Sequence, residues 1–206
     1  MIILDIFIKL ILISFFSFSI SLGNEKMIDN FSNNPELRWI FFADTVMGGR
    51  SSGIATFENS FVIGANAVAN GVGAGAIGAG AQSLATDSMA IGVNSSATAN
   101  QAFALGTNAS ASGVNSSAFG VGASASGANA VAVGTNAVAS GENALAFGSQ
   151  ALADQANSFV VGASAQACGV NAGAIGANAL ANGTNSLAIG VSSFAEQDGS
   201  LAVGTN

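Results

Sequence analysis

Small and large residues alternate along residues 61–206 in a pattern that repeats every fourteen residues. Numbered from Phe61, the repeat has alanine or serine at nearly all of positions 2, 7, 9 and 14. Glycine fills position 4 of every repeat: Gly64, Gly78, Gly92, Gly106, Gly120, Gly134, Gly148, Gly162, Gly176, Gly190 and Gly204. A strict short period of this kind is typical of one structural unit stacked on itself.

Small residues recur at positions 14, 2 and 4, and again at positions 7, 9 and 11. Alternation with a period of two is the pattern of a β-strand, so each repeat predicts two short strands with small side chains on their inward faces. Fourteen residues are too few for a wide coil around a bulky core. We therefore predict an all-β fold, a flattened parallel β-solenoid of 14-residue coils behind a short non-repetitive N-terminal segment.

Large apolar residues occupy position 3 of every repeat, and we predict that they point outward as a subunit interface. They are Ile63, Ile77, Ile91, Leu105, Phe119, Val133, Phe147, Val161, Ile175, Ile189 and Val203. Rungs about 4.8 Å apart would align them into a stripe about 50 Å tall. Soluble monomers rarely expose so much apolar surface, so the stripe favours a homo-oligomer. In the alternative, position 3 points inward and position 2 outward, which gives a thicker monomeric coil.

Positions 8 and 10 mix serine, threonine, asparagine and acidic residues with occasional valine or leucine, as expected for a solvated face. Asparagine recurs at position 13 and glycine at position 11. We interpret both as corner residues that adopt the unusual backbone torsions of a turn.

Charge is scarce and of one sign. Residues 61–206 contain five carboxylates and no lysine, arginine or histidine, which argues against binding of nucleic acid. The carboxylates are scattered, so no catalytic acid–base pair, metal site or cofactor site is predicted, and we expect no enzymatic activity. Cys168 is the only cysteine, which excludes an intrachain disulfide. We interpret it as a tolerated small outward residue, although it could pair between subunits.

The order of segments predicts three regions. Residues 1–23 are typical of a signal peptide, with an apolar run from Leu10 to Leu22 behind Lys9 and small residues before Asn24. An uncleaved membrane anchor is the alternative. Residues 24–60 form a non-repetitive segment with two expected strands, 37–43 and 53–57, and a possible role as an N-terminal cap. Residues 61–206 are the repeats. We expect export, to the cell surface or outer membrane, or to the extracellular medium without an anchor.

Within residues 24–60, Trp39 and the run from Asp44 to Gly53 (DTVMGGRSSG) resemble the start of the complex I intermediate-associated protein family. That resemblance implies a jelly-roll domain, but it covers this segment alone. It leaves open a remnant of an assembly or binding protein fused to the repeats.

Units such as 143–148 (NALAFG) and 185–190 (NSLAIG), each followed by further small residues, resemble the head repeats of YadA-like trimeric autotransporter adhesins. The resemblance covers residues 61–206. It implies a left-handed parallel β-roll, a homotrimer, display on a bacterial surface and binding of host or matrix components. The sequence up to Asn206 contains no neck, stalk or membrane anchor of that family, so we expect a head module or an exported protein used differently.

Ice binding by a flat solenoid face is a further alternative. Thr107, Thr135 and Thr205 occupy position 5, but alanine and valine interrupt them.

Overall fold

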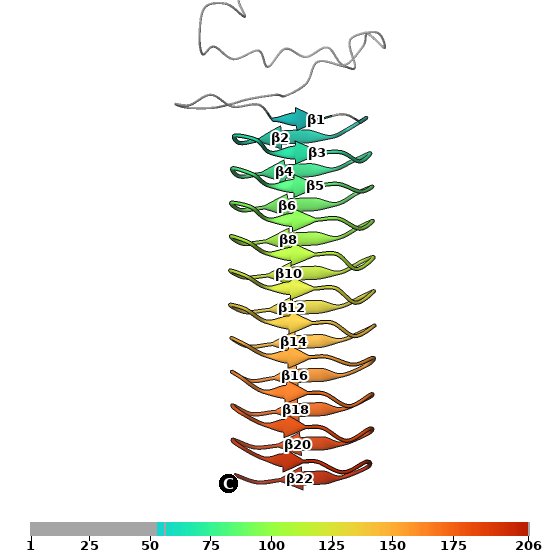
Figure 1. Cartoon of the computed structure of the whole chain (residues 1–206), viewed down its shortest axis with the longest axis vertical. Helices are drawn as coiled ribbons and strands as arrows, with labels where there is room; N and C mark the ends of the chain where they lie inside the picture. The colour runs from blue at the N-terminus through green and yellow to red at the C-terminus, as the bar shows by residue number, and fades with distance from the viewer. Residues whose placement is uncertain (1–52, 56, 206) are drawn as a thin grey trace, which may run out of the picture.

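The computed structural model describes residues 53–55 and 57–205 of the chain, which form short strands and turns and no helix. Two parallel sheets of eleven strands each face one another along the whole stack. One sheet contains the even-numbered strands and the other the odd-numbered strands, and the arrows of the two sheets run in opposite directions across the stack (Figure 1).

The strands are short and evenly spaced. The even sheet consists of β2 (Phe61–Ile63), β4 (Gly75–Ile77), β6 (Met89–Ile91), β8 (Phe103–Leu105), β10 (Ser117–Phe119), β12 (Val131–Val133), β14 (Leu145–Phe147), β16 (Phe159–Val161), β18 (Gly173–Ile175), β20 (Leu187–Ile189) and β22 (Leu201–Val203). The odd sheet consists of β1 (Ile54–Ala55), β3 (Val68–Ala69), β5 (Gln82–Ser83), β7 (Ser96–Ala97), β9 (Ser110–Ala111), β11 (Ser124–Ala125), β13 (Val138–Ala139), β15 (Leu152–Ala153), β17 (Gln166–Ala167), β19 (Leu180–Ala181) and β21 (Phe194–Ala195). Positions 1–3 thus form the even sheet, and positions 8 and 9 form the odd sheet.

Every strand pairs with the strand one coil further along, in parallel and fourteen residues apart. Ala118 of β10, for example, lies opposite Ala132 of β12. The predicted parallel β-solenoid with 14-residue coils is therefore confirmed. The stacking begins before the first full repeat, because Ile54 of β1 is paired with Val68 of β3 in the same register. Residues 1–52, including the predicted signal peptide and the first strand expected in the middle segment, lie outside the described residues, so the three-region division stays a prediction.

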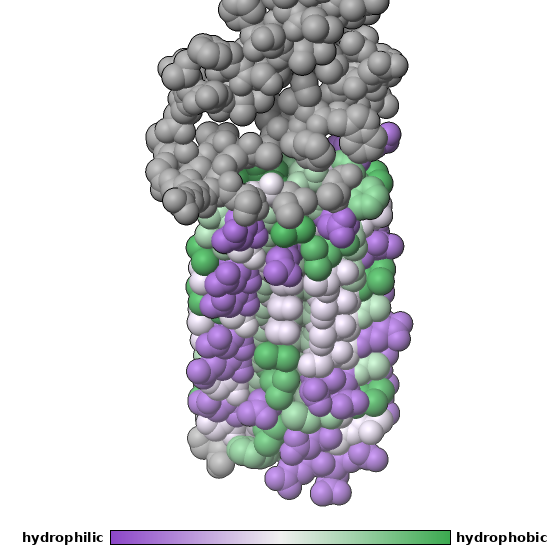
Figure 2. All heavy atoms as spheres, turned by 45° about the horizontal axis from the view of Figure 1, so that its top comes forward, coloured by the Kyte–Doolittle hydropathy of each residue, from purple (hydrophilic) through white to green (hydrophobic). Residues whose placement is uncertain are grey.

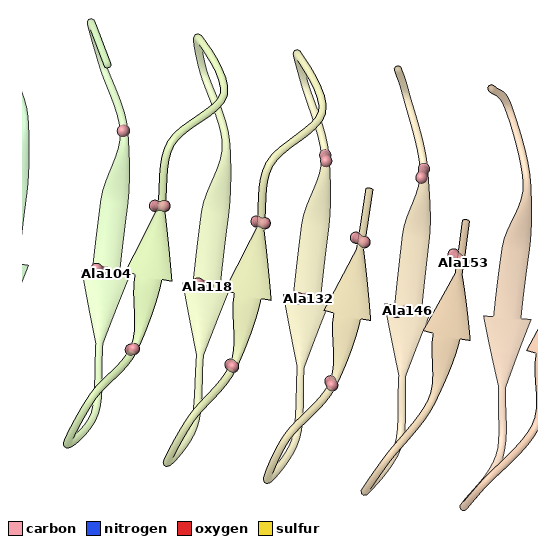
Figure 3. Packing of buried hydrophobic residues seen from close by; sticks show 14 of the residues in the cluster. Ala104, Ala118, Ala132, Ala146 and Ala153 are labelled. Atoms are coloured by element: carbon pink, nitrogen blue, oxygen red, sulfur yellow. The ribbon is translucent and has the colours of Figure 1, made fainter. Parts of the chain in front are cut away.

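The interior of the stack is thin and filled by small side chains. Residues at positions 2, 7, 9 and 14 are buried in almost every coil. Figure 3 shows this packing, with Ala104, Ala118, Ala132 and Ala146 repeating along one sheet. Among the described residues the largest fully buried side chains are Val62 and Val160. The two layers therefore lie too close together to enclose a leucine or an aromatic ring, which is the geometry that the alternation predicts.

Each coil turns two corners of the same design. At one corner the N–H of position 7 donates to the carbonyl of position 4, as from Ala109 to Gly106 at 3.2 Å. At the other, position 14 donates to position 11, as from Ser116 to Gly113 at 3.1 Å. The third residue of each turn, at position 6 or 13, has a positive φ throughout the described coils, as in Asn108 and Asn115 (both 57°). Asparagine and glycine tolerate this torsion best. The expectation for position 13 is met, and position 6 is a second such column that sequence analysis missed.

Glycine at position 11 has a different cause from the one predicted. These glycines lack a positive φ; instead a Cβ at Gly127 would collide with the carbonyl oxygen of Gly141 in the next coil. Glycine at position 4 meets both demands, since Gly134 has a φ of 133° and a Cβ there would collide with the carbonyl of Gly148. Close stacking of backbone on backbone, rather than torsion alone, therefore favours glycine at these corners. The preference at position 11 is not absolute, because alanine or glutamine occupies it in other coils, at Ala85, Ala99, Gln155 and Gln197.

Candidate functional site

The position-3 side chains project from the even sheet to the outside of the stack, as predicted. Ile63 is 44% exposed, Leu105 39%, Phe147 40% and Val161 47%. Val203, in the last coil, is 71% exposed, and the remaining six members are half-buried. We call these eleven residues the apolar stripe. The alternative in which position 3 points inward is wrong, because position 2 fills the interior. The role of the stripe in subunit contacts stays a prediction.

Position 1 lies beside the apolar stripe on the same face, and its large side chains fill gaps in that face. The rings of Phe61 and Phe159 occupy the space where a Cβ on Gly75 or Gly173 of the next coil would lie. In the same way Phe103 precedes Ser117 by one coil, and its ring meets Phe119 edge-on at 5.2 Å. Phe61 and Phe159 thus fill the gaps left by glycine one coil later, which extends the apolar outer face of the even sheet to position 1.

The sequence already contains this pairing of large and small residues at position 1. At position 1, each of the three phenylalanines is followed fourteen residues later by glycine or serine. Recognising it requires comparison of residues in the same column rather than along the chain. The interface prediction at position 3 alone therefore describes only half of the apolar face.

Asparagines at position 13 form a row along one corner of the stack. Their side-chain amides form a continuous hydrogen-bonded ladder, in which each Nδ2 donates to the Oδ1 of the asparagine in the next coil. The ladder runs through Asn115, Asn129, Asn143, Asn157, Asn171 and Asn185, with N···O distances of 2.9–3.2 Å. All six residues have a positive φ and are exposed. The ladder ties consecutive corners together, and we assign it a structural role.

The odd sheet presents a different outer face. Position 8 is serine at Ser96, Ser110 and Ser124, but in later coils it is Val138, Leu152, Leu180 and Phe194, interrupted by Gln166. Position 10 lies beside it. Figure 2 shows this face, with two pale columns along the stack that give way to hydrophobic and hydrophilic patches farther along; one flank is mostly hydrophilic, and the other mixes hydrophobic and hydrophilic side chains.

The carboxylates of the described residues are dispersed. The Oδ1 of Asp198 accepts a hydrogen bond from the backbone N–H of Thr184 at 2.8 Å, so this carboxylate caps the preceding coil. Gln155 donates to Asp154 at 3.0 Å. Across residues 53–205, no three histidine, cysteine or acidic side chains gather into a group that could hold a metal ion.

Cys168, at position 10, is a half-buried free thiol. Burial, and secondarily the negative charge of Asp154 one coil before, raises the pKa of this thiol. A raised pKa keeps the sulfur protonated and weakly nucleophilic near neutral pH. This state agrees with its interpretation as a tolerated outward residue.

The threonines considered for ice binding do not form a continuous row. Thr107 and Thr135 are exposed at the position-5 corner, but Val121 separates them and is itself 52% exposed. This column therefore alternates hydroxyl and methyl groups, and it provides no uniform threonine face.

A family model described as YadA head domain repeat, in two copies, matches residues 83–109, 111–137, 139–165, 167–190 and 181–206, more than half of the chain. No curated protein matches. The resemblance of residues 24–60 to the complex I intermediate-associated family is not borne out, since the matched residues begin at 83. The described part of the chain contains no helix of a length and hydropathy that could cross a membrane.

Proposed function

Because the chain belongs to the family of YadA head domain repeats, we propose that it is a non-enzymatic adhesin head whose copies assemble into a homotrimer through the apolar stripe. In this proposal the protein is exported, is displayed on a bacterial surface and binds host or matrix components. The family supplies the adhesin-type head. The trimer, the surface location and the ligand class are the proposal.

The observation that carries the proposal is the outward orientation of the large side chains. The interior contains nothing larger than valine, while the apolar stripe and the phenylalanines of position 1 lie outside. Burying the exposed parts of the eleven stripe residues would contribute roughly 10–20 kcal/mol per chain, as an upper estimate from apolar area. A contiguous apolar face of this height is rare on monomers and typical of interfaces.

The repetitive surface also supports adhesion rather than catalysis. Positions 5, 8, 10 and 12 present one outward side chain per coil, so the outer surface consists of parallel columns at a fixed pitch of about 4.8 Å. Such a rigid array can contact an extended ligand at many equivalent points, and assembly of copies multiplies these contacts.

Sedimentation of the full chain tests the assembly. We expect a trimer at micromolar concentration for the wild-type protein. In Ile91→Asp the charge would lie in the apolar stripe, and we expect dissociation because a buried unpaired carboxylate is strongly unfavourable. The matched control is Ser110→Asp, which introduces the same charge at a half-buried position of the odd sheet.

Circular dichroism must show that both variants retain the strand signal. A folded wild-type monomer would contradict the proposed assembly, and equal behaviour of the two variants would contradict the assignment of the even sheet as the contact face. Binding of immobilised matrix proteins by the wild-type chain, compared with Ile91→Asp, then tests the adhesive role and its dependence on several copies.

A further inference from the structure

The outer face of the odd sheet changes character along the stack. It begins with Val68 at position 8 of the first coil and Leu84 at position 10 of the second. In four successive coils position 8 is then polar, at Gln82, Ser96, Ser110 and Ser124. From β13 onward it is apolar in four of five coils, and we name these residues the odd-sheet apolar column: Val138, Leu152, Leu180 and Phe194. Phe194 is 52% exposed and the other three are half-buried.

Folding does not require these apolar side chains. The serines at position 8 of the earlier coils sit on the same backbone, with the same buried alanine beside them at position 9, as in Ser110–Ala111 and Leu180–Ala181. The replacement of serine by valine, leucine and phenylalanine therefore adds exposed apolar surface without changing the interior. The apolar stripe cannot account for it either, because that stripe lies on the opposite sheet.

Negative charge lines the same half of the face. Asp154 and Glu196 occupy position 10, two residues after Leu152 and Phe194, so their side chains project on the same side of the sheet about 7 Å away. Glu142 is exposed at the neighbouring corner. Residues 53–205 contain no lysine, arginine or histidine that could neutralise these carboxylates from within the described chain. The serine-bearing coils beside Ser96, Ser110 and Ser124 carry no carboxylate at position 10.

We propose that the odd-sheet apolar column and the carboxylates beside it bind an extended, basic segment of a partner protein in which lysine or arginine alternates with apolar residues. Such a segment, laid along the stack, directs its apolar side chains to one edge and its cationic side chains to the other. Its apolar side chains cover the residues at position 8, and its cationic side chains face the carboxylates at position 10. The patch is a few coils tall and binds weakly in one copy, and assembly strengthens the attachment by multiplying it.

This inference rests on the proposed function only in that assembly through the even sheet leaves the odd sheet accessible. The two are tested separately. Peptide binding by a chain that sediments as a monomer would support the binding face and contradict the proposed assembly. A trimer that does not bind the peptide would support the assembly and overturn this inference.

The probe is a short synthetic peptide of alternating lysine and leucine, labelled at one end and titrated with the full chain at low and moderate salt. We expect saturable binding that weakens as salt is raised, because exposed charges are screened. The same peptide with leucine replaced by glutamine, or with lysine replaced by glutamate, should bind at least tenfold more weakly. Equal binding of the lysine–glutamine peptide would show attraction by net charge alone and would overturn the proposal.

Matched variants locate the site. Phe194→Ser should weaken binding about tenfold, whereas Val121→Ser, which removes an equally exposed apolar side chain at a corner, should have no effect. Glu196→Gln and Asp154→Asn should each weaken binding about twofold to fivefold, with no effect of Asp87→Asn several coils away. If the control variants weaken binding as much as the site variants, or if neither set changes it, the odd-sheet apolar column is not the binding face.

Discussion

The two sheets of the solenoid share an interior and differ in their outer faces. Inside, Ala118 of the even sheet and Ala111 of the odd sheet are both completely buried in equivalent surroundings. Outside, the even sheet presents a large apolar side chain in every coil, while the odd sheet presents serine in some coils and valine, leucine or phenylalanine in others. The difference shows that the fold constrains only the inward and corner positions. The outward positions are free to carry association and recognition.

The largest expected effect comes from enlarging the shared interior. Ala111→Leu and Ala118→Leu should each lower the free energy of unfolding by about 3 kcal/mol or more, because the two layers have no room for a leucine. Ser110→Leu, at the outward neighbour of Ala111, should change it by less than about 0.5 kcal/mol.

Thermal and chemical unfolding followed by circular dichroism measures these differences. Equal costs for the two alanine variants would sharpen the comparison, since they would show that the sheets are equivalent inside. If Ser110→Leu proved as damaging as Ala111→Leu, the distinction between inward and outward positions would fail.

A smaller effect is expected at the corners that join the two sheets. Asn143 has a φ of 57° and both donates to and accepts from its neighbours in the asparagine ladder. Asn143→Gly removes the ladder bonds but tolerates the torsion, whereas Asn143→Ala loses both. We expect the alanine variant to be less stable than the glycine variant by about 1 kcal/mol.

The same unfolding measurements distinguish the two roles of this residue. The difference between alanine and glycine reports the torsion, and the difference between glycine and the wild type reports the ladder together with the backbone entropy of glycine. Equal stability of the two variants would mean that the positive φ imposes no requirement on this corner.

The smallest effect concerns the outer face of the odd sheet alone. Burial and, to a lesser degree, Asp154 raise the pKa of Cys168, so the folded protein holds the thiol proton more tightly than the unfolded chain does. The contribution of this thiol to stability therefore falls as the pH rises through the window from its ordinary pKa to its raised pKa.

Asp154→Asn should shift the pH profile of Cys168 alkylation to lower pH, but only in part, because burial remains. Asp87→Asn, which removes the same charge far along the stack, should leave the profile unchanged. An alkylation profile that is the same in Asp154→Asn and in the wild type would contradict the effect of the Asp154 charge on the pKa of Cys168.

Much of the fold could be predicted because each inward position of the repeat must hold a small side chain in almost every coil. The alternation of small residues predicted both strands, the thin interior and the outward direction of position 3, since a side chain such as Phe119 has no room inside. The prediction for position 11 was wrong because it treated glycine as a torsional residue. The carbonyl that excludes a Cβ from Gly127 belongs to the next coil, and contacts of that kind are not visible along a single repeat.

The candidate surfaces were predicted less completely than the fold. Position 3 was found because every repeat carries the same kind of residue there. Two other features depend on which residues stack in adjacent coils. They are the filling of gaps in that face by Phe61 and Phe159, and the odd-sheet apolar column that ends at Phe194. Such neighbours are fourteen residues apart in the chain and vary from coil to coil, so no consensus of the repeat contains them.

The sequence by itself determined the period, the two strands per coil and the size of the side chains that can lie inside, because a fourteen-residue turn leaves space only for alanine, serine, glycine and an occasional valine. The tertiary structure decided how the coils meet: which carbonyl lies against which glycine, which ring covers which gap, and which carboxylates share a face with which apolar side chains. These features arise from the contact of one coil with the next about 4.8 Å away, and that contact exists only once the chain has stacked upon itself.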